Sequence, residues 1–241
     1  MSKVLAVGDV HLKPKIFDQA EEILKSGQAD FAIQMGDLVD DWGEGFNLGL
    51  YTRTLERAIK FQKDHPNTLW VMGNHDYGYW HPDMGVRETG HSSFVEGEVL
   101  TFLKELERKG GIQKIMHVVD DVIFTHGGLM MSWVQGLVPA DSGWEDELTY
   151  VLNLVNDATP TDLWEENSPI WARPQLDGGE LYPCRLQVTG HTPVKQTGVY
   201  GGCLSTDTFS TYRSGAPYGD QKFAIVDTET GEWKVAQEDD G

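Results

Sequence analysis

Cysteine is nearly absent from this sequence, which has only Cys184 and Cys203 among its 241 residues. Two cysteines cannot build the disulfide framework that small secreted domains use, and these two lack the close spacing of a cysteine metal site. We therefore expect both to be reduced thiols with a structural role.

Basic residues are also scarce, with 19 Lys and Arg against 38 Asp and Glu, which gives a net charge of -19 at pH 7. Such a surface repels anions on average, and the sequence has no Lys/Arg cluster that could follow a nucleic-acid backbone. We therefore expect no nucleic-acid partner. Divalent cations in a cleft would nevertheless reverse the local field and attract a phosphate group.

Long apolar runs are missing as well. A membrane-spanning helix needs about 20 apolar residues, and no segment of the sequence approaches that length. The short apolar run near the N-terminus is also too brief for a signal-peptide core. We expect a soluble, cytoplasmic protein without a membrane partner, in which 39% hydrophobic residues suffice for a substantial core.

Short β-branched runs alternate with segments of helical periodicity, and this alternation predicts an α/β fold. The predicted strands are residues 4–7, 31–35, 69–72, 115–119, 122–125, 185–189, 203–206 and 222–227, and the predicted helices are 17–25, 50–63, 99–109 and 144–156. No glycine-serine linker interrupts the chain. We therefore expect one domain that spans residues 1–241.

Five short polar motifs follow predicted strands. They are Gly8-Asp9-Val10-His11, Gly36-Asp37-Leu38-Val39-Asp40, Gly73-Asn74-His75-Asp76, Thr125-His126-Gly127-Gly128 and Gly190-His191-Thr192-Pro193. In α/β sheets the loops beyond the carboxyl ends of the strands converge on one crevice, so these motifs should meet in space. A neighbouring glycine lets the backbone turn sharply there.

The side chains of these motifs are typical of a metal site. They offer carboxylate oxygens, imidazole nitrogens and one amide oxygen but no thiolate, a set that suits manganese, iron or zinc. On an extended strand end, the side chains of Asp9 and His11 would share one face, so both could reach the same ion.

Taken in this order, the five motifs resemble those of the calcineurin-like metallophosphoesterase superfamily. Within it the sequence looks most like bacterial and phage-type serine/threonine protein phosphatases, such as the lambda phosphatase, and like symmetrical diadenosine tetraphosphate hydrolases. The features that point there are Gly190-His191-Thr192-Pro193, Trp171-Ala172-Arg173, and Ser205-Thr206-Asp207-Thr208 followed by Tyr218-Gly219. The resemblance covers residues 4 to about 227 and implies an α/β/β/α sandwich.

The resemblance also implies a pair of divalent cations, with Mn²⁺ favoured over iron or zinc. Asp9 and His11 would bind the first cation, and Asp37 would bridge both. The second would be completed by Asn74, His126 and His191. A bridging hydroxide would then attack a phosphate ester directly, without a covalent enzyme intermediate.

Three further residues gain roles from the same resemblance. His75 would protonate the departing alkoxide, and Asp40 would hold the imidazolium by a charge-assisted hydrogen bond. Arg173 would bind two phosphate oxygens with its planar guanidinium.

One position departs from the phosphoprotein phosphatases, which usually carry Arg directly after the residue that corresponds to Asp40. This chain has Asp41, and a carboxylate would repel a dianionic monoester. The leading hypothesis is a phosphatase for a phosphoprotein or another phosphomonoester. The alternative is a dinucleoside polyphosphate hydrolase or phosphodiesterase, and a further alternative is a binding module that has lost catalysis.

The segment 77–94 follows His75 and is rich in aromatic residues, including Tyr77, Tyr79 and Trp80. We interpret it as an insert that could wall the substrate cleft, or alternatively as a small local core. The oligomeric state has no signal in the sequence.

Overall fold

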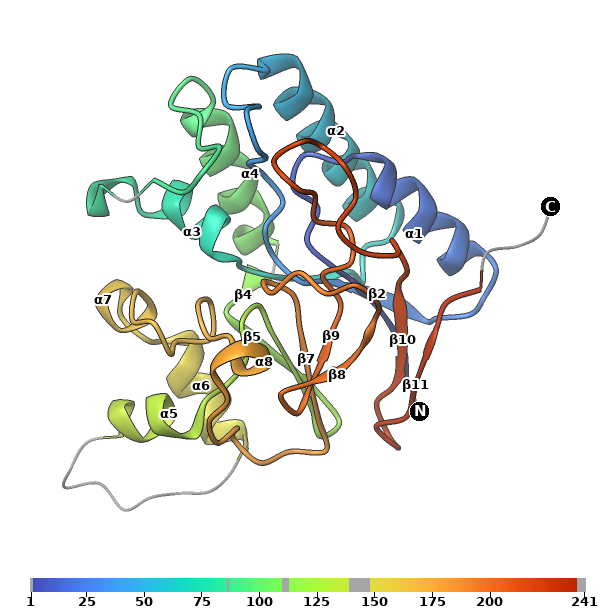
Figure 1. The fold of residues 1–241 in the computed structure, drawn as a ribbon, viewed down its shortest axis with the longest axis vertical. Coiled ribbons are helices and arrows are strands. Elements are labelled where there is room, and N and C mark those ends of the chain that lie inside the picture. The colour runs from blue at the N-terminus through green and yellow to red at the C-terminus, as the bar shows by residue number, and fades with distance from the viewer. Residues whose placement is uncertain (1, 86, 110–112, 139–147, 238–241) are drawn as a thin grey trace.

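The computed structural model describes residues 2–85, 87–109, 113–138 and 148–237. Two β-sheets pack face to face, and helices cover the outer face of each (Figure 1). The predicted α/β/β/α sandwich is thus confirmed.

The first sheet has the strand order β11-β10-β1-β2-β3-β4. Its strands are β1 (Lys3–Val7), β2 (Phe31–Gln34), β3 (Leu69–Val71), β4 (Gln113–Lys114), β10 (Ala224–Asp227) and β11 (Trp233–Val235). Strands β1, β2, β3 and β4 run parallel to one another, whereas β10 is antiparallel to β1 and β11. The parallel strands therefore end at one edge of the sheet.

The second sheet has the order β5-β6-β7-β9-β8. Its strands are β5 (Met116–Val119), β6 (Val122–Thr125), β7 (Leu186–Thr189), β8 (Gly198–Tyr200) and β9 (Cys203–Ser205). Strands β5 and β6 form an antiparallel pair, and β6, β7 and β9 are parallel, so their carboxyl ends also lie together.

The helices form the outer layers. They are α1 (Lys15–Lys25), α2 (Leu48–Asp64), α3 (Asn74–Trp80), α4 (Glu96–Arg108), α5 (Met131–Leu137), α6 (Leu148–Asn156), α7 (Pro160–Leu163) and α8 (Pro174–Asp177), with a 3-10 turn at Pro82–Met84. In Figure 1, α1, α2 and α4 lie on the side of the first sheet, and α5 and α6 lie on the side of the second.

Alternating residues of the strands fill the space between the sheets, because successive strand side chains point to opposite faces. Val4 and Ala6 of β1 meet Phe124 of β6 and Val188 of β7 in this middle layer. The opposite face of β1 presents Leu5 and Val7 to the outer helices.

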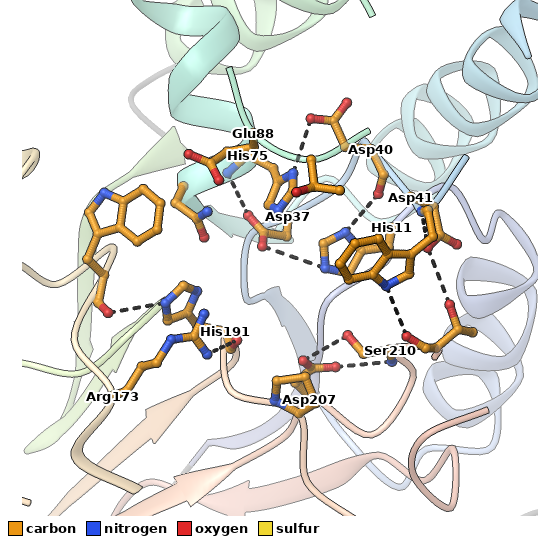
Figure 2. Close-up of a pocket in the computed structure, with 16 residues that line it drawn as sticks. His11, Asp37, Asp40, Asp41, His75, Glu88, Arg173, His191, Asp207 and Ser210 are labelled. Carbon is orange, nitrogen blue, oxygen red and sulfur yellow. Dashed lines mark hydrogen bonds and ion pairs between the residues drawn. The ribbon is translucent and has the colours of Figure 1, made fainter. Parts of the chain in front are cut away.

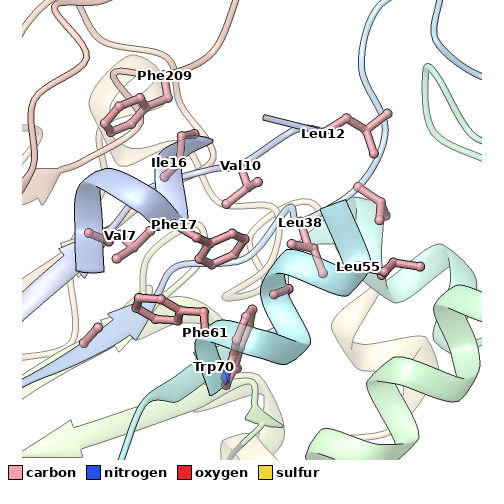
Figure 3. Close-up of a cluster of buried hydrophobic side chains, with 14 of the residues drawn as sticks. Val7, Val10, Leu12, Ile16, Phe17, Leu38, Leu55, Phe61, Trp70 and Phe209 are labelled. Atoms are coloured by element: carbon pink, nitrogen blue, oxygen red, sulfur yellow. The ribbon is translucent and has the colours of Figure 1, made fainter. Parts of the chain in front are cut away.

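The outer core of the first sheet is built around large aromatic side chains (Figure 3). Phe17 of α1 packs against Phe61 of α2 and Trp70 of β3, with ring centroids 5.2 and 5.9 Å apart. All three side chains are almost completely buried. Because this core fixes α1 and α2 on the sheet, it also fixes the loops that leave β1 and β2.

Most predicted elements are confirmed, but several were missed. The short strands β8 and β11 are edge strands with exposed residues and lack a clear apolar alternation. The two-residue strand β4 was also missed, and the predicted strand 115–119 corresponds to β5 in the other sheet. The helix α3 begins inside the third polar motif, so the segment 77–94 starts as helix. The first residues of the predicted helix 144–156, including Trp144, lie outside the described part of the chain.

Both cysteines are free, as predicted, and burial raises the pKa of Cys203 to about 12. In the part of the chain that the structure describes, no helix combines the length and apolar character needed to cross a membrane.

Candidate metal centre

The five polar motifs follow β1, β2, β3, β6 and β7 and meet at one edge of the sandwich, as the sequence predicted. There they line a cavity of about 240 Å³ (Figure 2). Its walls include His11, Asp37, Asn74, His75 and His191. Asp9 and His126 lie buried beneath them.

Several of these residues adopt a left-handed backbone conformation, which is unusual for residues other than glycine. The φ angles are 41° at His11, 52° at Asp37, 64° at Asp40 and 62° at His191. Such conformations cluster at functional sites, where the surrounding structure enforces them. The expectation that Asp9 and His11 share a face of an extended strand is therefore wrong, because β1 ends at Val7 and the chain turns at His11.

The turn nevertheless brings the first group of donors together. His11 Nε2 lies 3.8 Å from Asp9 Oδ2 and 3.7 Å from Asp37 Oδ2. His11, Asp37 and His75 offer donor atoms close enough to hold one metal ion.

A second group of donors shares the same carboxylate. His126 Nε2 lies 3.3 Å from Asp37 Oδ2 and 3.1 Å from Asn74 Oδ1. Asp37, His126 and His191 also offer atoms close enough to hold one metal ion. Asp37 therefore belongs to both groups of potential metal ligands, which is the position that a carboxylate bridging two metal ions would need.

Backbone carbonyls orient the three histidines. The distances are 2.8 Å from His11 Nδ1 to the Asp40 carbonyl and 2.7 Å from His126 Nδ1 to the Met35 carbonyl. His191 Nε2 lies 3.1 Å from the Trp171 carbonyl. A ring nitrogen that donates to a carbonyl leaves its neutral partner nitrogen free to bind a metal.

The electrostatics also favour neutral imidazoles at two of these positions. Burial lowers the pKa of His11, and burial together with the charge of His126 lowers the pKa of His191 far below its ordinary value. Neutral imidazole is the form that binds metals.

Three buried carboxylates, those of Asp9, Asp37 and Asp207, influence one another electrostatically. Burial and the nearby Asp207 raise the pKa of Asp9, and burial also raises that of Asp207. At Asp37 burial acts in the same direction, but His126 and His75 outweigh it and hold the pKa well below its usual range.

Sequence reasoning gave Asp207 no role, although it lines the cavity. It follows β9 just as Asp9 follows β1, and it accepts hydrogen bonds from Ser210 N and Oγ at 3.1 and 2.9 Å. Its position at the carboxyl end of a parallel strand was the signal that could have revealed it.

Asp76 is a second buried acid that the sequence left without a role. Its carboxylate accepts hydrogen bonds from the backbone N–H groups of Asp37, Leu38 and Gly73. Burial and the charge of Asp37 raise its pKa to about 7. Asp76 therefore ties the turn at Asp37 to the start of α3, which carries Asn74 and His75.

Glycine is required where two motifs approach each other most closely. A Cβ at Gly190 would lie 2.2 Å from Asp9 Oδ1, and one at Gly73 would lie 2.1 Å from Asp37 Oδ1. Both distances are shorter than non-bonded contacts allow. The glycines of the motifs thus let backbone and carboxylates pack in direct contact.

Replacing Gly190 by Ala should displace the Asp9 carboxylate and lower the free energy of unfolding by about 1–3 kcal/mol, the usual cost of overpacking. Urea denaturation measures this loss. Gly97→Ala is the control, because nothing lies within 4 Å of a Cβ at that position in α4. Equal stability of Gly190→Ala and the wild type would contradict the close packing.

His75 and Asp40 form a hydrogen-bonded pair at the cavity wall, as predicted. His75 Nδ1 donates to Asp40 Oδ2 at 3.1 Å. Tyr51 and Tyr79 donate their hydroxyls to the other oxygen, Asp40 Oδ1, each at 2.6 Å. Asp40 is fully buried, so these donors replace its lost hydration and fix its orientation.

The protonated form of His75 is favoured in this setting. Burial opposes the charge on its imidazole, but Asp37 and Asp40 outweigh burial and raise the pKa of His75 to about 9. Together with its place on the cavity wall, this makes His75 a suitable proton donor near neutral pH.

Arg173 lines the cavity on the side opposite His75 and Asp40 (Figure 2). Its Nη1 donates to the His191 carbonyl at 2.9 Å, and this bond directs the guanidinium along the wall. An anion in the cavity would meet this cation.

Asp41 lines the cavity too, but its charge is balanced. Lys13 Nζ lies 2.9 Å from Asp41 Oδ2, and Trp42 N donates to Asp41 Oδ1 at 2.8 Å. The repulsion that the sequence predicted for a dianionic substrate is therefore offset by Lys13.

Tyr77, Tyr79 and Trp80 of the segment 77–94 do not line the cavity. Tyr77 and Tyr79 are buried in different hydrophobic cores, and Trp80 packs against both cores. Glu88 and Thr89 of the same segment do line the cavity. The local-core alternative therefore describes Tyr77 and Tyr79.

The donor set fits a pair of divalent cations. It combines three buried carboxylates with oriented imidazoles and the amide oxygen of Asn74, and Asp37 stands between the two groups. Borderline metals such as manganese, iron and zinc prefer such nitrogen and oxygen ligands.

A family model described as calcineurin-like phosphoesterase matches residues 2–217. No curated protein matches the sequence.

Among solved structures, a protein serine/threonine phosphatase from Saccharomyces cerevisiae is 15% identical with a TM-score of 0.55, over 100% of this chain and 81% of that chain. A metallophosphoesterase from Sphaerobacter thermophilus is 14% identical with a TM-score of 0.42, over 99% of this chain and 89% of that chain. The likeness to the yeast protein shows a shared fold.

Proposed function

The chain belongs to the calcineurin-like phosphoesterase family, and from this premise we propose that it hydrolyses phosphomonoesters at the cavity formed by its polar motifs. Membership makes it a metal-dependent hydrolase of phosphate esters. The observation that carries the proposal is the position of Asp37 between two groups of potential ligands.

We assign the ligands from the geometry of the cavity. Asp9, His11 and Asp37 would hold the first cation, and Asp37, Asn74, His126 and His191 would hold the second. Manganese suits this set of nitrogen and oxygen donors. When bound, two divalent cations would activate a water molecule and neutralise the charge of the phosphoryl group.

Side chains of the protein would bind the substrate and protonate the leaving group. Arg173 would bind and orient phosphoryl oxygens with its guanidinium. His75 would donate its proton to the oxygen of the departing alcohol, while Asp40 holds the imidazolium in place. Tyr51 and Tyr79 would keep Asp40 oriented, because burial raises the pKa of both hydroxyls and keeps them protonated.

The choice between monoesters and the alternative dinucleoside polyphosphates rests on Asp41 and Arg173. The ion pair of Asp41 with Lys13 removes the main objection to a dianionic monoester, and Arg173 adds a cation to the cavity. The geometry therefore favours a phosphomonoester, including one carried by a phosphoprotein.

Hydrolysis of 4-nitrophenyl phosphate and of bis(4-nitrophenyl) phosphate tests this proposal. The protein is stripped of metal with a chelator, assayed, reloaded with Mn²⁺ and assayed again. Activity should return with metal and should be higher for the monoester. Faster hydrolysis of the diester would favour the alternative, and no hydrolysis of either ester or of diadenosine tetraphosphate would favour a binding module.

Metal should also stabilise the protein, because the cations would neutralise the buried carboxylates of Asp9, Asp37 and Asp207. At a free Mn²⁺ concentration of about 100 times Kd, the midpoint of thermal unfolding should rise by roughly 5–10 °C. Differential scanning calorimetry measures the shift. An Asp37→Asn protein should show a much smaller shift, and an unchanged midpoint in the wild type would contradict the proposed ligand set.

The pair of His75 and Asp40 should control the alkaline limb of the pH profile. Activity needs protonated His75, so it is present below the raised pKa and is lost as the pH rises through it. Replacing Asp40 by Asn removes a charge that raises this pKa, so the loss should begin at lower pH. A profile of kcat against pH for both proteins checks this, and an unshifted limb would contradict the role of Asp40.

A further inference from the structure

Three exposed aromatic side chains lie on two loops that also supply cavity-lining residues, Asp41 on one and Thr89 on the other. Trp42, Phe46 and Phe94 are 40%, 83% and 69% exposed. Trp42 lines the cavity itself, and the rings of Phe46 and Phe94 lie against each other with centroids 5.8 Å apart. We refer to Trp42, Phe46 and Phe94 as the aromatic ridge.

The ridge is built on two loops that pack tightly together. A Cβ at Gly90 would lie 2.6 Å from the Asp41 carbonyl oxygen, and a Cβ at Gly45 would lie 3.1 Å from the Gly90 carbonyl oxygen. Tyr51 ties the loops further, since its hydroxyl contacts the Gly90 carbonyl at 2.8 Å as well as Asp40. The ridge is thus held in a fixed position relative to the catalytic pair.

Trp42 is anchored although its ring is exposed. Its Nε1 donates to the Thr211 carbonyl at 3.2 Å, and the Arg213 guanidinium lies 4.9 Å from the ring centroid. These contacts hold the indole at the mouth of the cavity, where it can meet a substrate without rearrangement.

The charges around the ridge limit what it can bind. Lys13 pairs with Asp41, and Arg87 pairs with Glu96, so these cations are already neutralised. Glu88 on the cavity wall and Glu44 beside Phe46 form no ion pair among the described residues. Arg213 beside Trp42 has no ion pair among the described residues either, but the net charge of the whole chain, -19, disfavours a polyanion as the partner.

An apolar patch that adjoins a functional cavity marks a binding surface. We propose that the aromatic ridge binds the polypeptide part of a phosphorylated protein substrate, through apolar side chains that flank the phosphorylated residue. This inference rests on the proposed phosphomonoesterase function. Phe46 and Phe94 belong to the surface beyond the cavity, so a dinucleoside polyphosphate seated in the cavity would use Trp42 at most.

The test compares a small ester with phosphopeptides. The substrates are 4-nitrophenyl phosphate, a phosphoserine peptide with Leu and Phe flanking residues, and the same peptide with Ser and Gly in their place. The proteins are the wild type, the double variant Phe46→Ser/Phe94→Ser, and a control Ile59→Ser/Val199→Ser. Ile59 and Val199 are also exposed apolar side chains, at 47% and 52%, and neither lines the cavity. The control therefore removes exposed apolar surface outside the aromatic ridge.

We expect the wild type to prefer the apolar peptide by about tenfold in kcat/KM, since burial of even part of two aromatic side chains supplies that factor. Phe46→Ser/Phe94→Ser should lose this preference while its hydrolysis of 4-nitrophenyl phosphate stays unchanged. The control should behave as the wild type does.

Other results overturn the inference. The ridge has no docking role if the wild type shows no preference, or if Phe46→Ser/Phe94→Ser retains it. An equal loss with diadenosine tetraphosphate would assign the ridge to small molecules instead. If the metal-loaded wild type fails to hydrolyse 4-nitrophenyl phosphate, the proposed function fails and the ridge inference falls with it.

Discussion

An Asp37→Asn protein should retain its fold and lose nearly all of its phosphoesterase activity. Asp37 Oδ2 lies 3.7 Å from His11 Nε2 and 3.3 Å from His126 Nε2, so its carboxylate would serve both cations. An amide offers one neutral oxygen and cannot bridge two cations in the same way. We expect kcat/KM to fall by roughly 10³-fold or more, because catalysis by a metal pair supplies several kcal/mol.

Metal analysis separates this effect from a loss of structure. Asp37→Asn should bind less than the full amount of manganese while its circular dichroism spectrum stays native. Asp18→Asn is the matched control, because Asp18 pairs with Arg57 on the surface, away from the cavity. Full activity together with full metal content in Asp37→Asn would exclude Asp37 as the bridging ligand.

The second large effect is expected at His75. If His75 protonates the departing alkoxide, His75→Asn should slow the hydrolysis of an alkyl phosphate by about 10²–10⁴-fold. An ester with a good leaving group, such as 4-nitrophenyl phosphate, should lose much less, because nitrophenolate departs without protonation. A graph of log kcat against the pKa of the leaving group should therefore be steeper for the variant.

His81→Asn is the control for this substitution. His81 ends α3 and lies outside the cavity that His75 lines, so its loss should leave the rates on all esters near those of the wild type. An equal loss at His75 for good and poor leaving groups would show that His75 positions the substrate or the metals and does not act as an acid.

The negative charge of the whole chain agrees with a function in which bound metal cations attract the phosphate ester. With 38 acidic residues, the surface cannot draw in a phosphate by itself. Among the described residues, Arg173 is the one Lys or Arg that lines the cavity, and Lys13 pairs with Asp41. Binding of phosphate esters should therefore depend on metal much more than on surface charge.

Much of the candidate site could be predicted because its signals are local. A polar motif with a glycine at the end of a β-branched run identifies a strand end, and parallel strands bring their ends together. The structure places all six predicted ligands, with His75, Asp40 and Arg173, in or directly beneath one cavity. The left-handed turns at His11 and Asp37 were not predictable, since most Asp and His residues adopt other conformations even though both residue types are enriched in this one.

The sequence alone determined the α/β character of the fold, the order of the strand-end motifs and the chemistry of their donors, because each depends on neighbouring residues. Only the tertiary structure decided that Asp207 joins the site, that Lys13 neutralises Asp41, and that Phe46 meets Phe94. Those contacts join segments distant in sequence, and their geometry is set by the packing of helices and loops on the sheets. No local sequence pattern predicts that packing.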